Sequence, residues 1–301
     1  MYGGVQNPEP AEAFAIDDAW WPRYPRPGST FRHSVGARAA DPALWLRPRP
    51  LDPVLVAWKV SGFQTLGDAV FLARPGSEPA GAEALRLVEA AAGPTAPASG
   101  SGEPGSREQG HPLLVAARLV AEDLCLMDVR GPAPLLVAGA VAMPSRWLLA
   151  DKLGRDLIGV HGPVPGYAEE IGSPTDQLLR RLAGDRVMAR TAWTVTDDPA
   201  LFQPAERAWV ERDREAAVER LSIRTEYQTV RALSGSGAVL FTIRTAQEPV
   251  TALARRPDRA ATLLAVIRTL PPEQLVYRGI APYQAPLLAT LEEAASLPER
   301  A

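Results

Sequence analysis

The most constraining feature of this chain is a pair of strand-like runs joined by a turn of alternating serine and glycine. The runs are Leu221–Leu233 and Ala238–Gln247, and the turn is Ser234–Gly237. From Val239 to Ile243 every second residue is large and apolar, which is the spacing of a strand with one buried face. The sequence therefore predicts adjacent antiparallel strands in a sheet that covers a core.

The remaining elements complete an α+β pattern. Further strands are expected at Leu124–Val129, Leu135–Met143 and Arg186–Thr196, with one or two more inside Leu51–Phe71. Helices are expected at His111–Asp123, at Ser145–Leu153 with a Ser145 cap, from Ser173 to Gly184, at Asp258–Thr269 and at Pro286–Ser296. We expect a mainly antiparallel sheet with flanking helices. The order of these strands and helices along the chain fits a PAS-like topology, although their periodicity alone does not distinguish this topology from others.

The distribution of proline, glycine and serine sets the domain boundaries. Residues 1–50 are rich in proline and arginine and weakly patterned, so we predict an irregular N-terminal arm. Residues 51–280 form the predicted domain, and residues 281–301 a C-terminal helix. Within the domain, residues 92–110 contain little that a core would bury, and we predict that this insertion is mobile.

Composition excludes several classes of partner. The chain has 32 Lys and Arg against 35 Asp and Glu, a formal charge of −3, which gives no basic surface for nucleic acid. Its single cysteine excludes a disulfide framework. The N-terminus lacks the basic and apolar regions of a secretory signal, and the longest charge-free apolar run is shorter than the ~20 residues that span a bilayer. We expect a cytoplasmic protein without membrane or nucleic-acid partners.

The inventory of reactive residues is short. Phosphate-binding glycine loops, dinucleotide fingerprints and nucleophile elbows are missing from the sequence, which contains only three histidines. A metal bound here should therefore bring most of its own ligands, as haem does, because the porphyrin supplies four nitrogens. His161 is the candidate axial ligand, since the spaced prolines Pro163 and Pro165 stiffen its segment. The alternative is a histidine at the edge of the core, hydrogen-bonded to a carbonyl.

Five motifs together resemble one family, the haem-dependent oxidative N-demethylases, also known as the haem subunit of dimethylamine monooxygenase. The resemblance runs in order from Ala40 to Arg278. The motifs are Glu122-Asp123-Leu124-Cys125-Leu126-Met127, Pro144-Ser145-Arg146-Trp147, Lys152-Leu153-Gly154, Val160-His161-Gly162-Pro163-Val164-Pro165 and Phe241-Thr242-Ile243-Arg244-Thr245, and Tyr277-Arg278-Gly279 stands where the family has Tyr-Lys-Gly.

The resemblance implies a PAS-like fold that encloses haem b and an enzyme that oxidises a small secondary amine with O2. The products would be a primary amine and an aldehyde. Because the sequence carries no flavin, nicotinamide or iron–sulfur motif, the electrons would come from separate reductase subunits, which hold flavin and an iron–sulfur centre in the relatives. His161 matches the motif histidine of the family and is the expected axial ligand of the haem iron.

The resemblance also assigns candidate site residues. The segment RTEYQT that begins at Arg224 is similar to an R-x-E-R-Q-T strand of the family. Glu226 would hold a cationic amine or relay protons; alternatively, Glu226 is a solvated residue paired with Arg224 or Arg244. Tyr227 departs from that strand, and the hypothesis that it reaches the haem rests on its position alone. Arg190 and Arg244 would bind the haem propionates, or each is a surface arginine on a strand.

Departures from the family pattern concern the substrate. Tyr227 replaces an arginine, Ala192 stands where relatives have asparagine, and Ala232-Leu233-Ser234 replaces an Arg-Leu-Pro-like stretch. The loss of the arginine and the asparagine removes two hydrogen-bond donors. These departures put dimethylamine in doubt and leave open a larger or less cationic substrate.

Other interpretations remain open. Cys125 lies in an apolar strand, where it is either a small core residue or a haem thiolate. Instead of a monooxygenase, the chain could be a haem-based sensor that binds without turnover, although no output module is visible. It could also be a haemless PAS-like scaffold subunit.

Overall fold

The computed structural model describes residues 6–8, 15–16, 31–46, 49–50, 52–92, 110–204 and 218–298. The predicted insertion at 92–110 lies almost entirely outside the described residues, as does most of the segment 1–30 of the predicted arm. Within the described ranges, no helix combines the length and the apolarity that crossing a bilayer requires.

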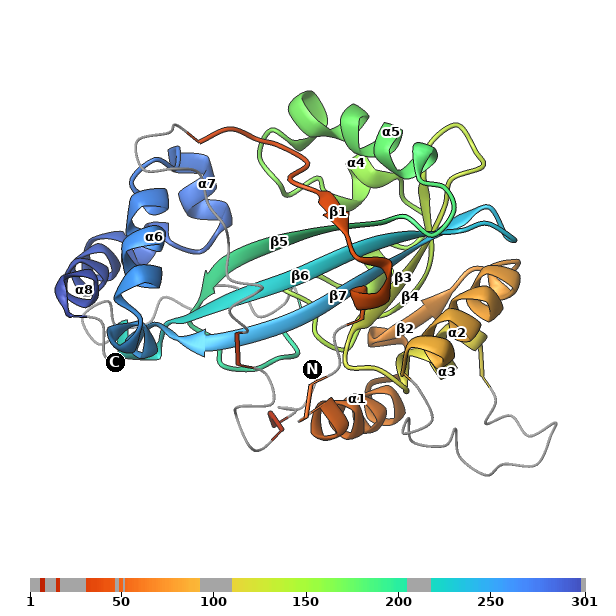
Figure 1. Cartoon of the computed structure of the whole chain (residues 1–301), viewed down its shortest axis with the longest axis horizontal. Coiled ribbons are helices and arrows are strands. Elements are labelled where there is room, and N and C mark those ends of the chain that lie inside the picture. The colour runs from red at the N-terminus through yellow and green to blue at the C-terminus, as the bar shows by residue number, and fades with distance from the viewer. Residues whose placement is uncertain are drawn as a thin grey trace.

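The described residues form a single sheet of seven strands, in which every pair of neighbouring strands is antiparallel (Figure 1). The spatial order is β1-β5-β6-β7-β3-β4-β2. The strands are β1 (Arg38–Ala40), β2 (Phe71–Ala73), β3 (Asp123–Asp128), β4 (Leu135–Ala140), β5 (Val187–Thr196), β6 (Ser222–Leu233) and β7 (Ala238–Pro249).

Helices lie on both faces and at one end of this sheet (Figure 1). They are α1 (Asp52–Leu66), α2 (Glu78–Ala92), α3 (Pro112–Ala117), α4 (Leu157–Val160), α5 (Ser173–Arg181) preceded by a π-helix (Tyr167–Gly172), α6 (Pro257–Ile267), α7 (Pro272–Tyr277) and α8 (Gln284–Ser296). Helices α1 to α3 lie on one face, here called the α1 face, and α4 and α5 on the other, the α4 face. Helices α6 to α8 gather at one end of the sheet.

Alternation along the central strands divides the core into these two faces. Leu126 and Leu240 pack on the α1 face with Leu113 from α3. Cys125, one position away on β3, packs on the α4 face with Leu157 from α4. Because successive strand residues point to opposite faces, each position of β6 and β7 can be assigned to one side of the sheet.

The α+β class, the antiparallel sheet and the flanking helices are confirmed. Strands β3 to β7 coincide with the predicted strands within a few residues, and α6 and α8 with the last two predicted helices. The helix expected at His111–Asp123 ends at Ala117, because the chain turns and enters β3.

The prediction of strands in Leu51–Phe71 is wrong for most of that segment, which forms α1. Leu55, Lys59 and Phe63 are buried at the four-residue spacing of a helix. The lysine interrupts the apolar pattern of this buried stripe and conceals its period in the sequence. Only β2, beginning at Phe71, is extended.

The prediction of a helix that begins at Ser145 is also wrong. A short 3-10 helix, Leu149–Asp151, occupies the segment, and its N-cap is Leu148 without a side-chain hydrogen bond. Ser145 lies upstream of this helix, and its hydroxyl is bound to residues of β6 instead.

Candidate functional site

The predicted site residues divide between the two faces of the sheet. Arg190 on β5 is in register with Gln228 on β6, and Glu226 is two positions along β6, so these side chains share the α4 face. Tyr227 and Arg244 are in register with each other on the α1 face. Glu226 and Tyr227 are therefore separated by the sheet, although they are adjacent in sequence.

His161 lies at the carboxyl end of α4. Asp156 caps the start of this short helix by accepting a 2.7 Å hydrogen bond from the Gly159 amide. The Nδ1 atom of His161 is 2.9 Å from the Leu157 carbonyl oxygen. Its half-buried ring stacks on Tyr167, with ring centroids 4.2 Å apart and 8° between the planes. The helix end and the tyrosine thus fix the imidazole.

Burial lowers the pKa of His161 from 6.5 to about 4, and the charges of Arg190 and Lys152 act in the same direction. The imidazole is therefore neutral at physiological pH. Because the carbonyl can only accept, Nδ1 carries the proton and Nε2 keeps its lone pair. Nε2 makes no hydrogen bond to any residue within the described ranges.

A chain of hydrogen bonds runs along the α4 face from Arg190 to Glu226. The Nε–H of Arg190 donates to Gln228 Oε1 at 2.7 Å, and Gln228 Nε2 donates to Glu226 Oε2 at 2.8 Å. Arg190 Nη1 also donates to the Val35 carbonyl at 3.3 Å. The charge of Arg190 lowers the pKa of His161 and opposes the rise in the pKa of Tyr277, so this arginine is close enough to act on both side chains.

The other oxygen of Glu226 is held by the loop that follows β4. Ser145 Oγ donates to Glu226 Oε1 at 2.6 Å and accepts from the Nε–H of Arg224 at 2.8 Å. Burial lowers the pKa of Arg224 to about 10, and the charge of Glu226 opposes that shift. The half-buried Glu226 is thus connected to Arg224 through a serine rather than by direct pairing.

Arg244 belongs to a buried ionic cluster on the α1 face. Its guanidinium pairs with Asp52 at the start of α1 and lies 3.8 Å from Glu122 Oε1. Burial raises the pKa of Glu122, and the charge of Arg244 opposes this effect. The Arg244 side chain is 1% exposed, which makes it a residue of the interior rather than of the surface.

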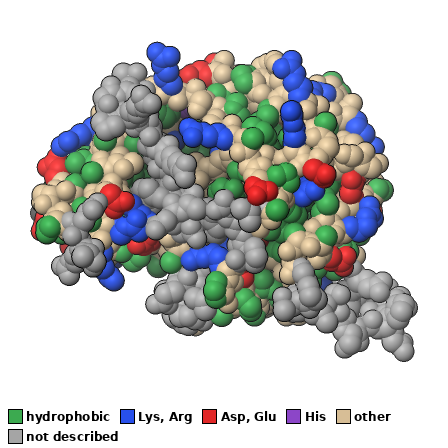
Figure 2. Space-filling view, in the orientation of Figure 1, with side chains coloured by type: hydrophobic (Ala, Val, Ile, Leu, Met, Phe, Trp, Pro, Cys, Tyr) green, Lys and Arg blue, Asp and Glu red, His purple; other side chains and the backbone are tan. Residues whose placement is uncertain are grey.

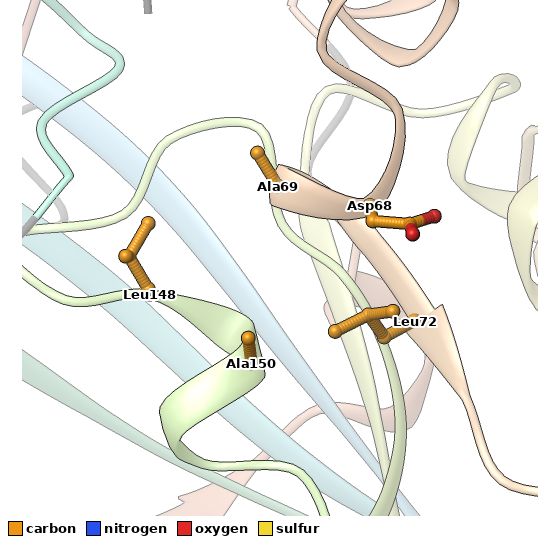
Figure 3. A pocket seen from close by; sticks show the side chains of 5 residues that line it. All are labelled: Asp68, Ala69, Leu72, Leu148 and Ala150. Atoms are coloured by element: carbon orange, nitrogen blue, oxygen red, sulfur yellow. The ribbon is translucent and has the colours of Figure 1, made fainter. Parts of the chain in front are cut away.

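Two pockets of the described residues are open to solvent. The first, about 240 Å³, is formed by mainly apolar side chains at the edge strand β2, with the Asp68 carboxylate pointing away from the others (Figure 3). It contains none of the predicted site residues. The second, about 270 Å³, adjoins the segment after His161; it is lined by Phe31, Arg32, His33, Pro165, Gly166, Glu170, Pro271 and Glu273.

The chemistry of the donors fits an axial haem ligand at His161. A neutral imidazole whose Nδ1 is held by a carbonyl presents Nε2 to a metal in the usual way. Cys125 offers a thiol in the core of the α4 face, where burial raises its pKa and disfavours the thiolate. The described residues contain no group of three His, Cys, Asp or Glu side chains that could hold a metal ion.

Comparison with known protein families gives one match. The model of the family described as haem-dependent oxidative N-demethylase, alpha subunit-like, matches residues 90–288. The chain belongs to this family. The matched residues include β3 to β7, His161, Arg190 and Glu226. The family description names haem and an oxidative reaction, and "alpha subunit" implies that further subunits exist.

Sequence reasoning missed two residues of the polar chain, Ser145 and Gln228. Period-two alternation would have found Gln228, because it shares its face with Arg224 and Glu226. The partnership of Ser145 with Glu226 spans 81 positions, and no local pattern predicts it. On the surface, Figure 2 shows Lys and Arg side chains as separate groups interspersed with Asp and Glu on the face in view.

Proposed function

We propose that this chain is the haem b-binding subunit of an oxygen-using enzyme that removes a methyl or similar group from a small amine by oxidation. The observation that carries the proposal is the neutral, fixed imidazole of His161 with Nε2 without a partner among the described residues. The family match, which includes this residue, supports the cofactor and the type of reaction.

The residues that would hold the haem are His161 and Arg190. His161 would be the axial ligand through Nε2. Arg190 uses Nε and Nη1 for Gln228 and Val35, and its Nη2 makes no hydrogen bond to a described residue, so it can bind a propionate. When bound, haem supplies the iron at which oxygen is activated with electrons from a reductase.

The order of the strands supports a PAS-like fold for the predicted domain at 51–280. Without the edge strands β1 and β2, the order is β4-β3-β7-β6-β5. Numbered along the chain, this is 2-1-5-4-3, the order of a PAS sheet. The haem would then lie on the α4 face, where His161, Arg190 and Glu226 are found.

Glu226 would bind the amine. A carboxylate has about four acceptor positions, and Ser145 and Gln228 occupy two of them. The others can accept an N–H of a protonated amine or hold its proton. Tyr227 and Arg244 lie on the α1 face, so neither side chain would contact the amine.

The register of β5 bears on the size of the substrate. Ala192 lies directly opposite Glu226, so a methyl group is the neighbour of the carboxylate at the position where relatives have asparagine. The smaller side chain leaves more room and removes an amide donor. We therefore propose an amine larger than dimethylamine. Separate subunits with flavin and an iron–sulfur centre would supply the electrons.

The test is the visible absorption spectrum of the purified protein reconstituted with haemin, before and after dithionite, for wild type and His161→Ala. We expect a Soret band that is lost or strongly shifted in the variant. His111→Ala is the matched control, because His111 is a half-buried histidine that caps α3 on the α1 face, and it should leave the band unchanged.

Each outcome separates the alternatives. A Soret band that is indifferent to His161→Ala would move the ligand elsewhere. Haem binding without oxidation of any amine in the presence of O2 and a reductant would favour a sensor. A wild-type protein that binds no haem would overturn the proposal and leave a scaffold subunit.

A further inference from the structure

The Glu226 carboxylate is fixed from two directions. Gln228, on the same strand, donates to Oε2, and Ser145, from the loop after β4, donates to Oε1. The 2.6 Å separation between Ser145 Oγ and Glu226 is in the range of a charge-assisted hydrogen bond. A half-buried carboxylate that is bound at both oxygens cannot rotate freely.

The direction of the serine hydroxyl is also determined. Arg224 Nε–H donates to Ser145 Oγ at 2.8 Å and occupies one of its lone pairs. Since a guanidinium has no acceptor, the hydroxyl proton cannot point toward Arg224. It points instead to the carboxylate of Glu226, which only accepts when it is ionised.

The loop that presents Ser145 is strained at the next residue. Arg146 has φ 62°, and it is the only described residue other than glycine with a positive φ. Its amide donates to the Gln203 carbonyl at 2.7 Å, and its guanidinium is 3.2 Å from Asp197. Such strain persists only where the surroundings enforce it, and it is concentrated at functional sites.

The loop is anchored before Ser145 as well. The carboxylate of Asp123 accepts from the amides of Ala142 and Met143 at 3.0 and 2.8 Å. Arg224 Nη2 donates to the Met143 carbonyl at 2.9 Å. These buried contacts hold the backbone before the serine, and the hydrogen bond of the Arg146 amide holds it after the serine. The position of the Ser145 hydroxyl is therefore built into the fold.

We propose that Ser145 and Gln228 are positioning residues that hold the Glu226 carboxylate oriented toward a bound amine. This inference rests on the proposed function, because it concerns the same site. Because Ser145 and Gln228 fix the carboxylate, its remaining lone pairs point in a fixed direction. An N–H donor of a protonated amine is the ligand chemistry that matches them.

The experiment is difference infrared spectroscopy of the carboxylate stretching bands in the full chain, with and without haemin. The spectrum of wild type minus Glu226→Gln identifies the Glu226 band. We expect this band to shift in Ser145→Ala and in Gln228→Met, and to shift further in the double variant. Ser145→Thr, which keeps the hydroxyl, should restore the wild-type position.

A matched control is present in the β6–β7 hairpin. Ser236 Oγ donates to Glu83 at 2.8 Å, so Ser236→Ala removes a similar hydrogen bond at the surface and should leave the Glu226 band unchanged. Thermal melting verifies that each variant is folded. If the band keeps its wild-type position in both folded variants, the positioning role is overturned. Failure of haem binding in wild type overturns the proposed function alone, because the band is measurable without haemin.

Discussion

The ammonium of Lys59 lies 3.5 Å from the carboxylate of Asp123, and neither side chain has exposed surface. Burial lowers the pKa of Lys59 and raises that of Asp123, and their mutual attraction opposes both shifts. Lys59 also donates to the carbonyls of Val120 and Glu122. The pair joins α1 to the start of β3 and, through Asp123, to the loop that presents Ser145.

Removing one partner of this pair should destabilise the fold strongly. Lys59→Met leaves Asp123 buried without its cation, and we expect a loss of about 3–5 kcal/mol in the free energy of unfolding. The control is Arg268→Ala, which breaks an exposed pair with Glu292 and should cost less than about 1 kcal/mol. Urea unfolding measures both, and equal losses would contradict the prediction.

The left-handed backbone at Arg146 predicts an unusual order of stability. Arg146→Ala and Arg146→Gly both lose the contact with Asp197. Only glycine adopts φ 62° without a steric cost, so Arg146→Gly should be more stable than Arg146→Ala by about 1 kcal/mol. Thermal unfolding of the two variants compares them directly; an alanine variant as stable as the glycine variant would refute backbone strain here.

The lowered pKa of His161 predicts a dependence of stability on pH. The unfolded chain binds a proton at the usual pKa of 6.5, whereas the folded chain resists protonation until about pH 4. The free energy of unfolding should therefore fall as the pH drops from 6.5 to 4, and this contribution should be constant outside that window. His161→Leu should reduce the slope, as urea titrations at several pH values will measure. An unchanged slope would exclude the shift.

Burial of Cys125 predicts an unreactive thiol. The side chain is 3% exposed, and desolvation raises its pKa, so a thiol reagent should label it only after unfolding. Cys125→Ser should also keep the Soret band of the haemin-reconstituted protein. Rapid labelling of the native protein, or loss of the band in the serine variant, would restore the thiolate as a candidate ligand.

Strands with clear alternation and bounded by turns could be predicted from sequence, as β6 and β7 show. The first helix could not, because Lys59 stands in its buried stripe. The Lys59 ammonium can be buried because it interacts with Asp123 and with two backbone carbonyls, all of which are distant in sequence. A local pattern contains no information about such partners.

The candidate site was partly predictable for the same reason. His161 and Glu226 stand out by residue type and motif, and alternation alone separates Tyr227 from Glu226. The contact of Ser145 with Glu226 depends on how a loop after β4 meets β6. That meeting is determined by the order of strands in the sheet and by the conformation of Arg146, and neither is encoded in a local pattern.

The two outermost strands of the sheet have three residues each. Short edges offer another chain few free amides and carbonyls, and this protects a protein against aggregation through strand pairing. On one side the protection comes from β1, which pairs with only the first part of the ten-residue β5. A chain that lacks residues 38–40 would leave residues 187–189 of β5 without a partner strand, whereas Val195 near the other end of β5 would keep its hydrogen bond to the Arg278 carbonyl. Residues 38–40 therefore shorten the free edge of the sheet and contribute to colloidal stability.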